Sequence, residues 1–133
     1  MTKLKDIDYT DIQNLCIKYC IDRLGLDLSI KDFKEIADRN KTAFTKIEEL
    51  NRGDIILRGC ENPSFTYSKP LIIKNRVIDR PVNTQYHCLV YEGDNTFSDA
   101  IIDDNYFLTI RMRLFEDLPT VQRTWKVPRT VFN

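Results

Sequence analysis

Two different periods of apolar residues divide the chain into a helical first part and a β-rich second part. Between residues 11 and 24, apolar residues recur around most of a helical wheel, and the only continuous polar strip consists of Asn14, Lys18 and Asp22. This pattern predicts a largely enclosed helix, as expected of a central helix that packs on a sheet.

Capping signals locate the ends of the predicted helices. Thr10 and Gln13 have the spacing of a capping box, which starts the first helix at residue 11. Ser29 and Asp32 have the same spacing before an amphipathic stripe, so a second helix is predicted over residues 29–37. A short third helical segment is predicted over residues 43–49.

From residue 54 onward the apolar period changes to two, which is typical of β-strands. The predicted strands cover residues 54–58, 85–91, 96–102, 107–115 and 123–127. In the fourth strand, Arg111 and Arg113 alternate with apolar residues, so we expect their charges to line a solvated face. We expect Trp125 to pack in the core or at a sheet edge. Helices followed by an antiparallel sheet indicate an α+β domain.

The only histidine of the chain lies in a predicted hairpin that turns at Gly93. Pairing about that turn joins residues whose numbers sum to about 186, so we expect His87 opposite Asp99 and Tyr91 opposite Asn95. An imidazole beside a carboxylate is the base and orienting pair of a nucleophilic triad. The alternative is a structural histidine whose polar atoms are satisfied by a neighbouring acid.

Composition narrows the classes of function. With 133 residues and 42% hydrophobic content, the chain suits one domain over residues 1–133. The 20 basic and 20 acidic residues cancel, which argues against a nonspecific binder of nucleic acid or of anionic membranes. No long apolar segment and no apolar signal core are present, so we expect a cytoplasmic protein that no membrane anchors.

The cysteines show neither a disulfide framework nor a strong metal motif. Cys16, Cys20, Cys60 and Cys88 contain no C-x-x-C pair, and Cys88 should point to the opposite face of its strand from His87. We therefore expect reduced, buried structural thiols and neither a metal nor a cofactor.

Residues 87–100, His-Cys-Leu-Val-Tyr-Glu-Gly-Asp-Asn-Thr-Phe-Ser-Asp-Ala, resemble a segment of the NlpC-type papain-like cysteine peptidases, which cut bacterial peptidoglycan stems. In that family the catalytic histidine opens the pattern H-V-G-I-Y-x-G-x-x-x-F-x-H-A. The overlay has no gap and puts Asp99 at the third, polar position of the triad. In the family, a leucine-rich bend followed by G-D-hydrophobic introduces the strand that comes before the histidine strand. Residues 50–57, Leu-Asn-Arg-Gly-Asp-Ile-Ile-Leu, resemble this element. The resemblance implies a papain-like core, with N-terminal helices packed on a mostly antiparallel sheet of five to six strands.

The family's nucleophile position is occupied by isoleucine. Family members open the central helix with D-C-S-G and end it about a dozen residues later with G-hydrophobic-x-L, and counting back from Gly25 puts Ile12 on the cysteine. Isoleucine has no nucleophilic atom, so the resemblance implies a lost activity. Cys16 is the rival nucleophile. Cys16 lies one helical turn after Ile12, a displacement of about 6 Å along the helix axis. This distance would keep the thiol beyond hydrogen-bonding distance of His87 unless the helix is shifted by one turn.

The family pattern does not cover residues 60–85, which we interpret as an insertion. It contains Pro63, Pro70 and Pro81, and we predict a small hairpin that turns at residues 74–75. The insertion is either a lid or partner surface over the cleft, or a passive flap.

Three functions are consistent with the sequence. We favour a catalytically inactive papain-like domain that acts as a binding or regulatory module for an unknown protein or peptide, because Ile12 replaces the nucleophile. The short sequence, rich in Lys, Asp, Ile and Asn, fits a small phage accessory protein acting in the host cytoplasm. The second is an active thiol hydrolase, similar to a peptidoglycan endopeptidase or amidase, with Cys16 as nucleophile, His87 as base and Asp99 as orienting group. The third is an α+β interaction domain unrelated to peptidases.

Overall fold

A computed structural model describes residues 9–59, 71–73, 76–78, 86–102, 108–118 and 123–132. Within these ranges it describes the backbone alone of residues 9–13, 71–73, 76–78 and 102. The helices are α1 (Tyr9–Leu24) and α2 (Ile30–Asn40), and short 3-10 turns lie at Ile47–Glu49, Phe115–Asp117 and Arg129–Phe132. The strands are β1 (Thr42–Ala43), β2 (Ile55–Gly59), β3 (Leu71–Ile73), β4 (Arg76–Ile78), β5 (His87–Gly93), β6 (Thr96–Ile102), β7 (Leu108–Leu114) and β8 (Arg123–Val127).

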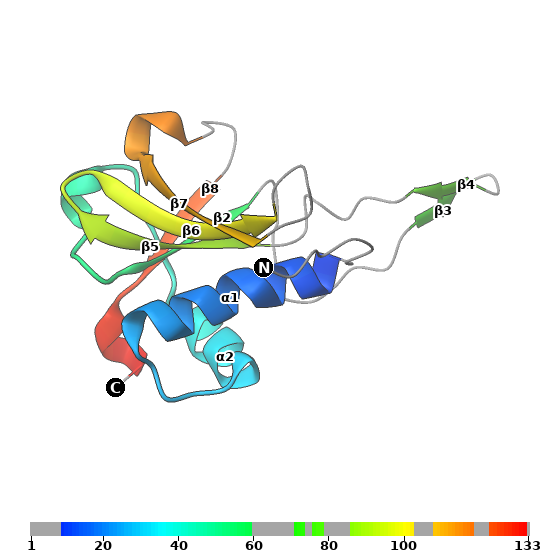
Figure 1. Cartoon of the computed structure of the whole chain (residues 1–133), viewed down its shortest axis with the longest axis horizontal. Coiled ribbons are helices and arrows are strands. Elements are labelled where there is room, and N and C mark those ends of the chain that lie inside the picture. Colours follow the sequence, from blue (N-terminus) through cyan, green and yellow to red (C-terminus); the bar gives the residue numbers. More distant parts are fainter. Residues whose placement is uncertain are drawn as a thin grey trace.

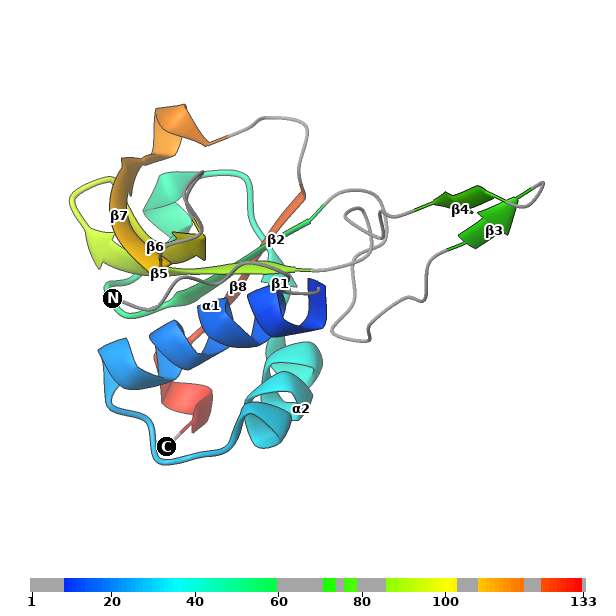
Figure 2. The same ribbon diagram turned by 45° about the vertical axis from the view of Figure 1, so that its right-hand side comes forward.

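Six strands form one sheet in the order β1-β8-β2-β5-β6-β7, and all their described pairs are antiparallel. Helix α1 lies along one face of this sheet, and α2 lies beyond α1 (Figure 1). Figure 2 shows the C-terminal 3-10 turn beside α2, where Phe132 stacks on Phe33 at 5.2 Å between ring centroids. The predicted α+β architecture, with two helices on a mostly antiparallel sheet, is confirmed.

The local signals of the two helices explain their ends. The Ser29 hydroxyl caps α2 by accepting a hydrogen bond from the Asp32 amide at 3.1 Å, as predicted. Helix α1 begins at Tyr9, two residues before the predicted start, and ends at a left-handed Gly25 with φ +64°. The Leu26 amide then donates to the Ile21 carbonyl at 3.0 Å, which closes the last turn.

The predicted third helical segment over residues 43–49 is wrong in its first half. Thr42 and Ala43 form strand β1 and pair with Lys126 and Trp125 of β8, and only Ile47–Glu49 is helical. The long-range pairing with β8 overrides the local helical preference there. The small hairpin predicted inside residues 60–85 is confirmed as β3 and β4, which pair antiparallel.

Alternation along the strands separates two apolar cores, one on each face of the sheet. In β2, Ile55 and Leu57 face the helices, and Ile56 faces the other side. The buried core on the helix side contains Cys16, Ile17, Cys20, Ile21, Phe33, Ala37, Ile55, Leu57, Tyr86, Cys88, Val90 and Val127. The core on the opposite side contains Phe44, Leu50, Ile56, Leu89, Tyr91, Phe97 and Leu118. Trp125 packs against the helix-side core, edge-on to Tyr86 at 5.6 Å, in agreement with its predicted role.

The orientation expected for β7 is wrong. Arg111 and Arg113 do not line a solvated face but turn toward Asp99, whose side chain is fully buried. The register explains this, because Arg111 is paired with Asp99 and so shares its face of the sheet. The apolar residues that alternate with the arginines are the exposed ones: Leu108, Ile110, Met112 and Leu114.

No helix in the described part of the chain is both long and apolar enough to cross a membrane.

Phe97 anchors the core opposite the helices. It is fully buried and contacts the rings of Tyr91 and Phe115 at centroid distances of 5.1 and 6.1 Å. We expect Phe97→Ala to lower the free energy of unfolding by about 3–5 kcal/mol, because it removes a buried ring and leaves a cavity. Urea titration followed by circular dichroism measures this change. Lys31→Ala, on the exposed face of α2, should shift the free energy by less than about 0.5 kcal/mol; equal effects would contradict this assignment of the core.

Candidate functional site

The hairpin that holds the histidine turns about one residue later than predicted, which shifts its register by two residues. Val90 pairs with Ser98 and Tyr91 with Phe97, so the numbers sum to 188, and a bulge separates Tyr91 from Gly93. The expected pairing of Tyr91 with Asn95 is therefore wrong. Asp94 and Asn95 form the turn, both with positive φ (51° and 63°), as a two-residue type I′ turn requires.

The predicted contact between His87 and Asp99 is present in spite of this difference in register. A shift of two residues keeps every side chain on its predicted face, because side chains alternate with a period of two. Continuing the observed register would set Asp99 opposite Leu89, diagonal to His87, which long side chains can still span. The Nε2 atom of His87 lies 2.7 Å from Oδ2 of Asp99. The predicted contact is present.

A second cation, missed by the sequence reading, holds the same carboxylate. Arg111 donates from Nε to Oδ1 of Asp99 at 3.0 Å and from its terminal nitrogen to Oδ2 at 2.6 Å. Such a two-point guanidinium–carboxylate pair is strong and directional. Arg113 lies farther away, at 3.9 Å from Oδ2. Asp99 thus joins side chains of β5, β6 and β7.

These contacts fix the charge of Asp99. Burial by itself would raise the pKa of this carboxyl, but the hydrogen bonds from His87 and Arg111, and their positive charges, lower the pKa to about 2. Asp99 is therefore ionised at neutral pH.

His87 is held in its protonated form. Burial opposes the charge and would lower the pKa of the imidazole, whereas hydrogen bonds with Asp99 and Cys16 raise the pKa to about 9. Because Nε2 faces Asp99, Nδ1 is the ring nitrogen left for Cys16. The His87 side chain is 29% exposed, so the imidazole reaches the surface.

Cys16 comes within hydrogen-bond reach of His87, although the helix register predicted a separation of one turn. Its thiol also interacts with the Cys88 side chain. The Cys88 hydrogen bond, opposed by burial and assisted by His87, lowers the pKa of Cys16 well below its usual value. The pKa of Cys88 is raised by the same hydrogen bond and by burial. The structure thus brings together all three predicted residues, in the order Cys16, His87, Asp99.

The side chain of Ile12 and the whole of Cys60 lie outside the part of the chain that the structure describes. The backbone of Ile12 is the fourth residue of α1, in its first turn as predicted, but its side chain is outside the description. Cys60 and most of the predicted insertion are also outside it, apart from β3 and β4.

A polar network fastens α1 to the hairpin beside this site. The Tyr19 hydroxyl donates to Oγ of Ser98 at 2.7 Å, and the Ser98 hydroxyl donates to Glu92 at 2.5 Å. Arg23, in the last turn of α1, forms an ion pair with the same Glu92. The network holds the helix against β5 and β6, and with it the backbone that carries Cys16.

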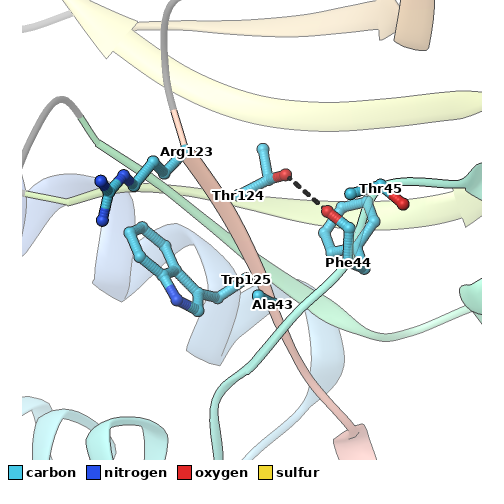
Figure 3. Close-up of a pocket in the computed structure, with 6 residues that line it drawn as sticks. All are labelled: Ala43, Phe44, Thr45, Arg123, Thr124 and Trp125. Carbon is cyan, nitrogen blue, oxygen red and sulfur yellow. Dashed lines mark hydrogen bonds between the residues drawn. The ribbon is translucent and has the colours of Figure 1, made fainter.

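A surface hollow lies elsewhere, at the β1–β8 edge of the sheet. Its volume is about 330 Å³, and it is lined by Ala43, Phe44, Thr45, Arg123, Thr124 and Trp125 (Figure 3). The Thr124 hydroxyl of β8 donates to the carbonyl of Phe44, the residue after β1, at 3.2 Å. None of the lining residues belongs to the His87 cluster, so the hollow is not the entrance to that site.

Among the described side chains, no group of three or more His, Cys, Asp or Glu is arranged to hold a metal ion. Comparison with known protein families, with curated proteins and with solved structures found no match to this chain. The chemistry of the site is therefore argued from its own geometry.

A thiol, an imidazole and a carboxylate in sequence are the parts of a cysteine nucleophile's triad. Two features depart from a working site. The Cys16 residue is only 2% exposed, within the helix-side core. It is also the eighth residue of α1, beyond the first turn in which the helix dipole lowers a thiol pKa.

The charge of His87 can be titrated without ambiguity, because the chain has one histidine. We expect the ring-proton NMR signal of His87 to titrate near pH 9 and Asp99→Asn to lower this pKa, since the substitution removes the anion and leaves Arg111. An apparent pKa close to 6.5 in the native chain would contradict the described cluster.

The same shifts set the pH dependence of stability. The raised pKa of His87 stabilises the fold fully below its ordinary 6.5, and this contribution is lost as pH rises through about 9. The lowered pKa of Asp99 stabilises the fold above its ordinary 3.8, and this contribution is lost as pH falls toward about 2. We therefore expect the contribution of the pair to be largest between about pH 4 and 6.5, as urea titrations of the native chain and Asp99→Asn across pH would show.

Proposed function

We propose that this protein is a catalytically inactive papain-like domain of the NlpC type, which acts as a binding or regulatory module for a protein or peptide. The observation that carries the proposal is the burial of Cys16. A nucleophilic thiol must reach a substrate carbonyl, and reactive cysteines are partly exposed. Among the described residues, Cys16 is the thiol that meets His87, and it is 2% exposed in the core.

The helix geometry supports the same conclusion. Because α1 begins at Tyr9, residue 12 stands in the first turn, where the resemblance places the nucleophile, and that residue is isoleucine. Cys16 stands one turn later. Arg111 also supports an inactive domain. It binds both oxygens of Asp99, so this carboxylate takes part in a structural ion pair in addition to its contact with His87. The phage origin and the host cytoplasm remain parts of the proposal that rest on the sequence alone.

A second candidate function is an active thiol hydrolase, and the opposite pKa shifts of Cys16 and His87 favour it. Both shifts favour the charged forms, the thiolate of Cys16 and the imidazolium of His87. In such an enzyme the Cys16 thiolate would attack an amide carbonyl, and the imidazolium would give its proton to the leaving amine. Water, deprotonated by His87, would then cleave the thioester and release the acid.

Alkylation separates the two candidates. We expect iodoacetamide to label Cys16 at least about a hundredfold more slowly in the native protein than in urea, because labelling requires the core to open. Peptide mass spectrometry reads the label at each cysteine. Cys20, which is also fully buried, is the matched internal control and should be protected to a similar degree. Rapid native labelling of Cys16 alone, slowed by His87→Ala, would instead support the active hydrolase.

Activity is the second test. We expect the native chain to release no product from peptidoglycan stem peptides, because Cys16, the described thiol that meets His87, is buried. In Ile12→Cys we expect a thiol that alkylates quickly in the native state, with Ile12→Ser as the control. Turnover need not return, since oxyanion donors contribute several kilocalories per mole independently of the triad. Hydrolysis by the native protein that disappears in Cys16→Ser would make Cys16 the nucleophile.

A further inference from the structure

Strand β7 exposes its apolar side chains and turns its charges inward. It is the last strand in the order of the six-stranded sheet, and within the described residues it pairs with β6 alone. Its solvent-facing row consists of Leu108 (37% exposed), Ile110 (53%), Met112 (62%) and Leu114 (42%). We refer to these four residues as the β7 stripe.

Strand β7 lacks the outward charges that usually protect an edge strand from pairing with another strand. Edge strands of soluble proteins are usually short or carry outward charges that prevent pairing with another strand. Here Arg111 and Arg113 are directed to Asp99, so the seven-residue strand has no charged side chain in its exposed row. Contiguous apolar rows beside an open strand edge are typical of sites where a further strand is added.

We propose that the β7 stripe binds the same stripe of a second copy of this chain, by antiparallel pairing of two β7 strands. The strand reads Leu-Thr-Ile-Arg-Met-Arg-Leu and is self-complementary about Arg111. A twofold axis at Arg111 sets Leu108 against Leu114 of the second copy and Ile110 against its Met112. Every pair on the exposed face is then apolar, and the two sheets become one.

Charge repulsion across this pairing is limited to one contact. On the opposite face, the two Arg111 side chains meet near the axis, but each is paired with its own buried Asp99. Thr109 comes opposite Arg113, so no further like charges face each other. The net charge of the chain is +0, so two copies do not repel at long range. This inference does not depend on the proposed function of the His87 cluster.

The test compares two double variants at the same positions. Light scattering after size-exclusion chromatography gives the mass of the native chain and of each variant over a range of concentrations. We expect the native chain to have twice the monomer mass at high concentration and to dissociate on dilution. I110K/M112K should be monomeric throughout, because two ammonium groups then oppose each other at both contacts. Circular dichroism should show native secondary structure in each variant, since both positions are exposed.

I110E/M112K is the matched control. The proposed register sets each introduced carboxylate opposite an introduced ammonium of the other copy, so this variant should dimerise, and added salt should weaken its dimer more than the native one. A native chain that is monomeric at every concentration would overturn the proposal and point to a strand of another protein as the occupant. A dimer unaffected by I110K/M112K, or equal dissociation of both double variants, would also overturn it.

Discussion

The structure depends on one buried charge, the carboxylate of Asp99. Removing a carboxylate from water is unfavourable by several kcal/mol, and it is tolerated only where cations and hydrogen bonds compensate for the lost hydration. His87 supplies one such contact from β5, and Arg111 supplies two from β7. The need to satisfy this group therefore joins three neighbouring strands. It also determines which face of β7 is turned inward, and hence leaves the apolar residues of that strand exposed.

The same charge shapes the proposed function. The groups that would form a catalytic triad lie together, yet two of them also have a structural partner: Asp99 is held by Arg111, and Cys16 interacts with Cys88 in the helix-side core. An imidazolium fixed between an anion and a buried thiol satisfies all three polar groups. A pair that resembles catalytic machinery is therefore compatible with the catalytically inactive domain that we propose.

Much of the fold followed from local patterns in the sequence, and the failures have physical causes. The helices, the hairpins and the His87–Asp99 contact were predictable from apolar periods and turn residues, and the contact survived a register error because an even shift preserves the face. The direction of Arg111 was not predictable. Alternation divides a strand into two faces but does not say which is buried, and here a single distant carboxylate decides it. The contact between Cys16 and His87 was also not predictable, because it depends on how α1 packs on the sheet.

The role of Asp99 in holding the sheet together can be measured by the unfolding free energy of Asp99→Asn at neutral pH. We expect a loss of about 3 kcal/mol, toward the lower end for broken buried ion pairs because His87 and Arg111 are partly exposed. Asp94→Asn, at a position whose side chain is 97% exposed, should change little. An unchanged or increased stability of Asp99→Asn, as is common when a strained catalytic group is removed, would contradict this structural role of Asp99.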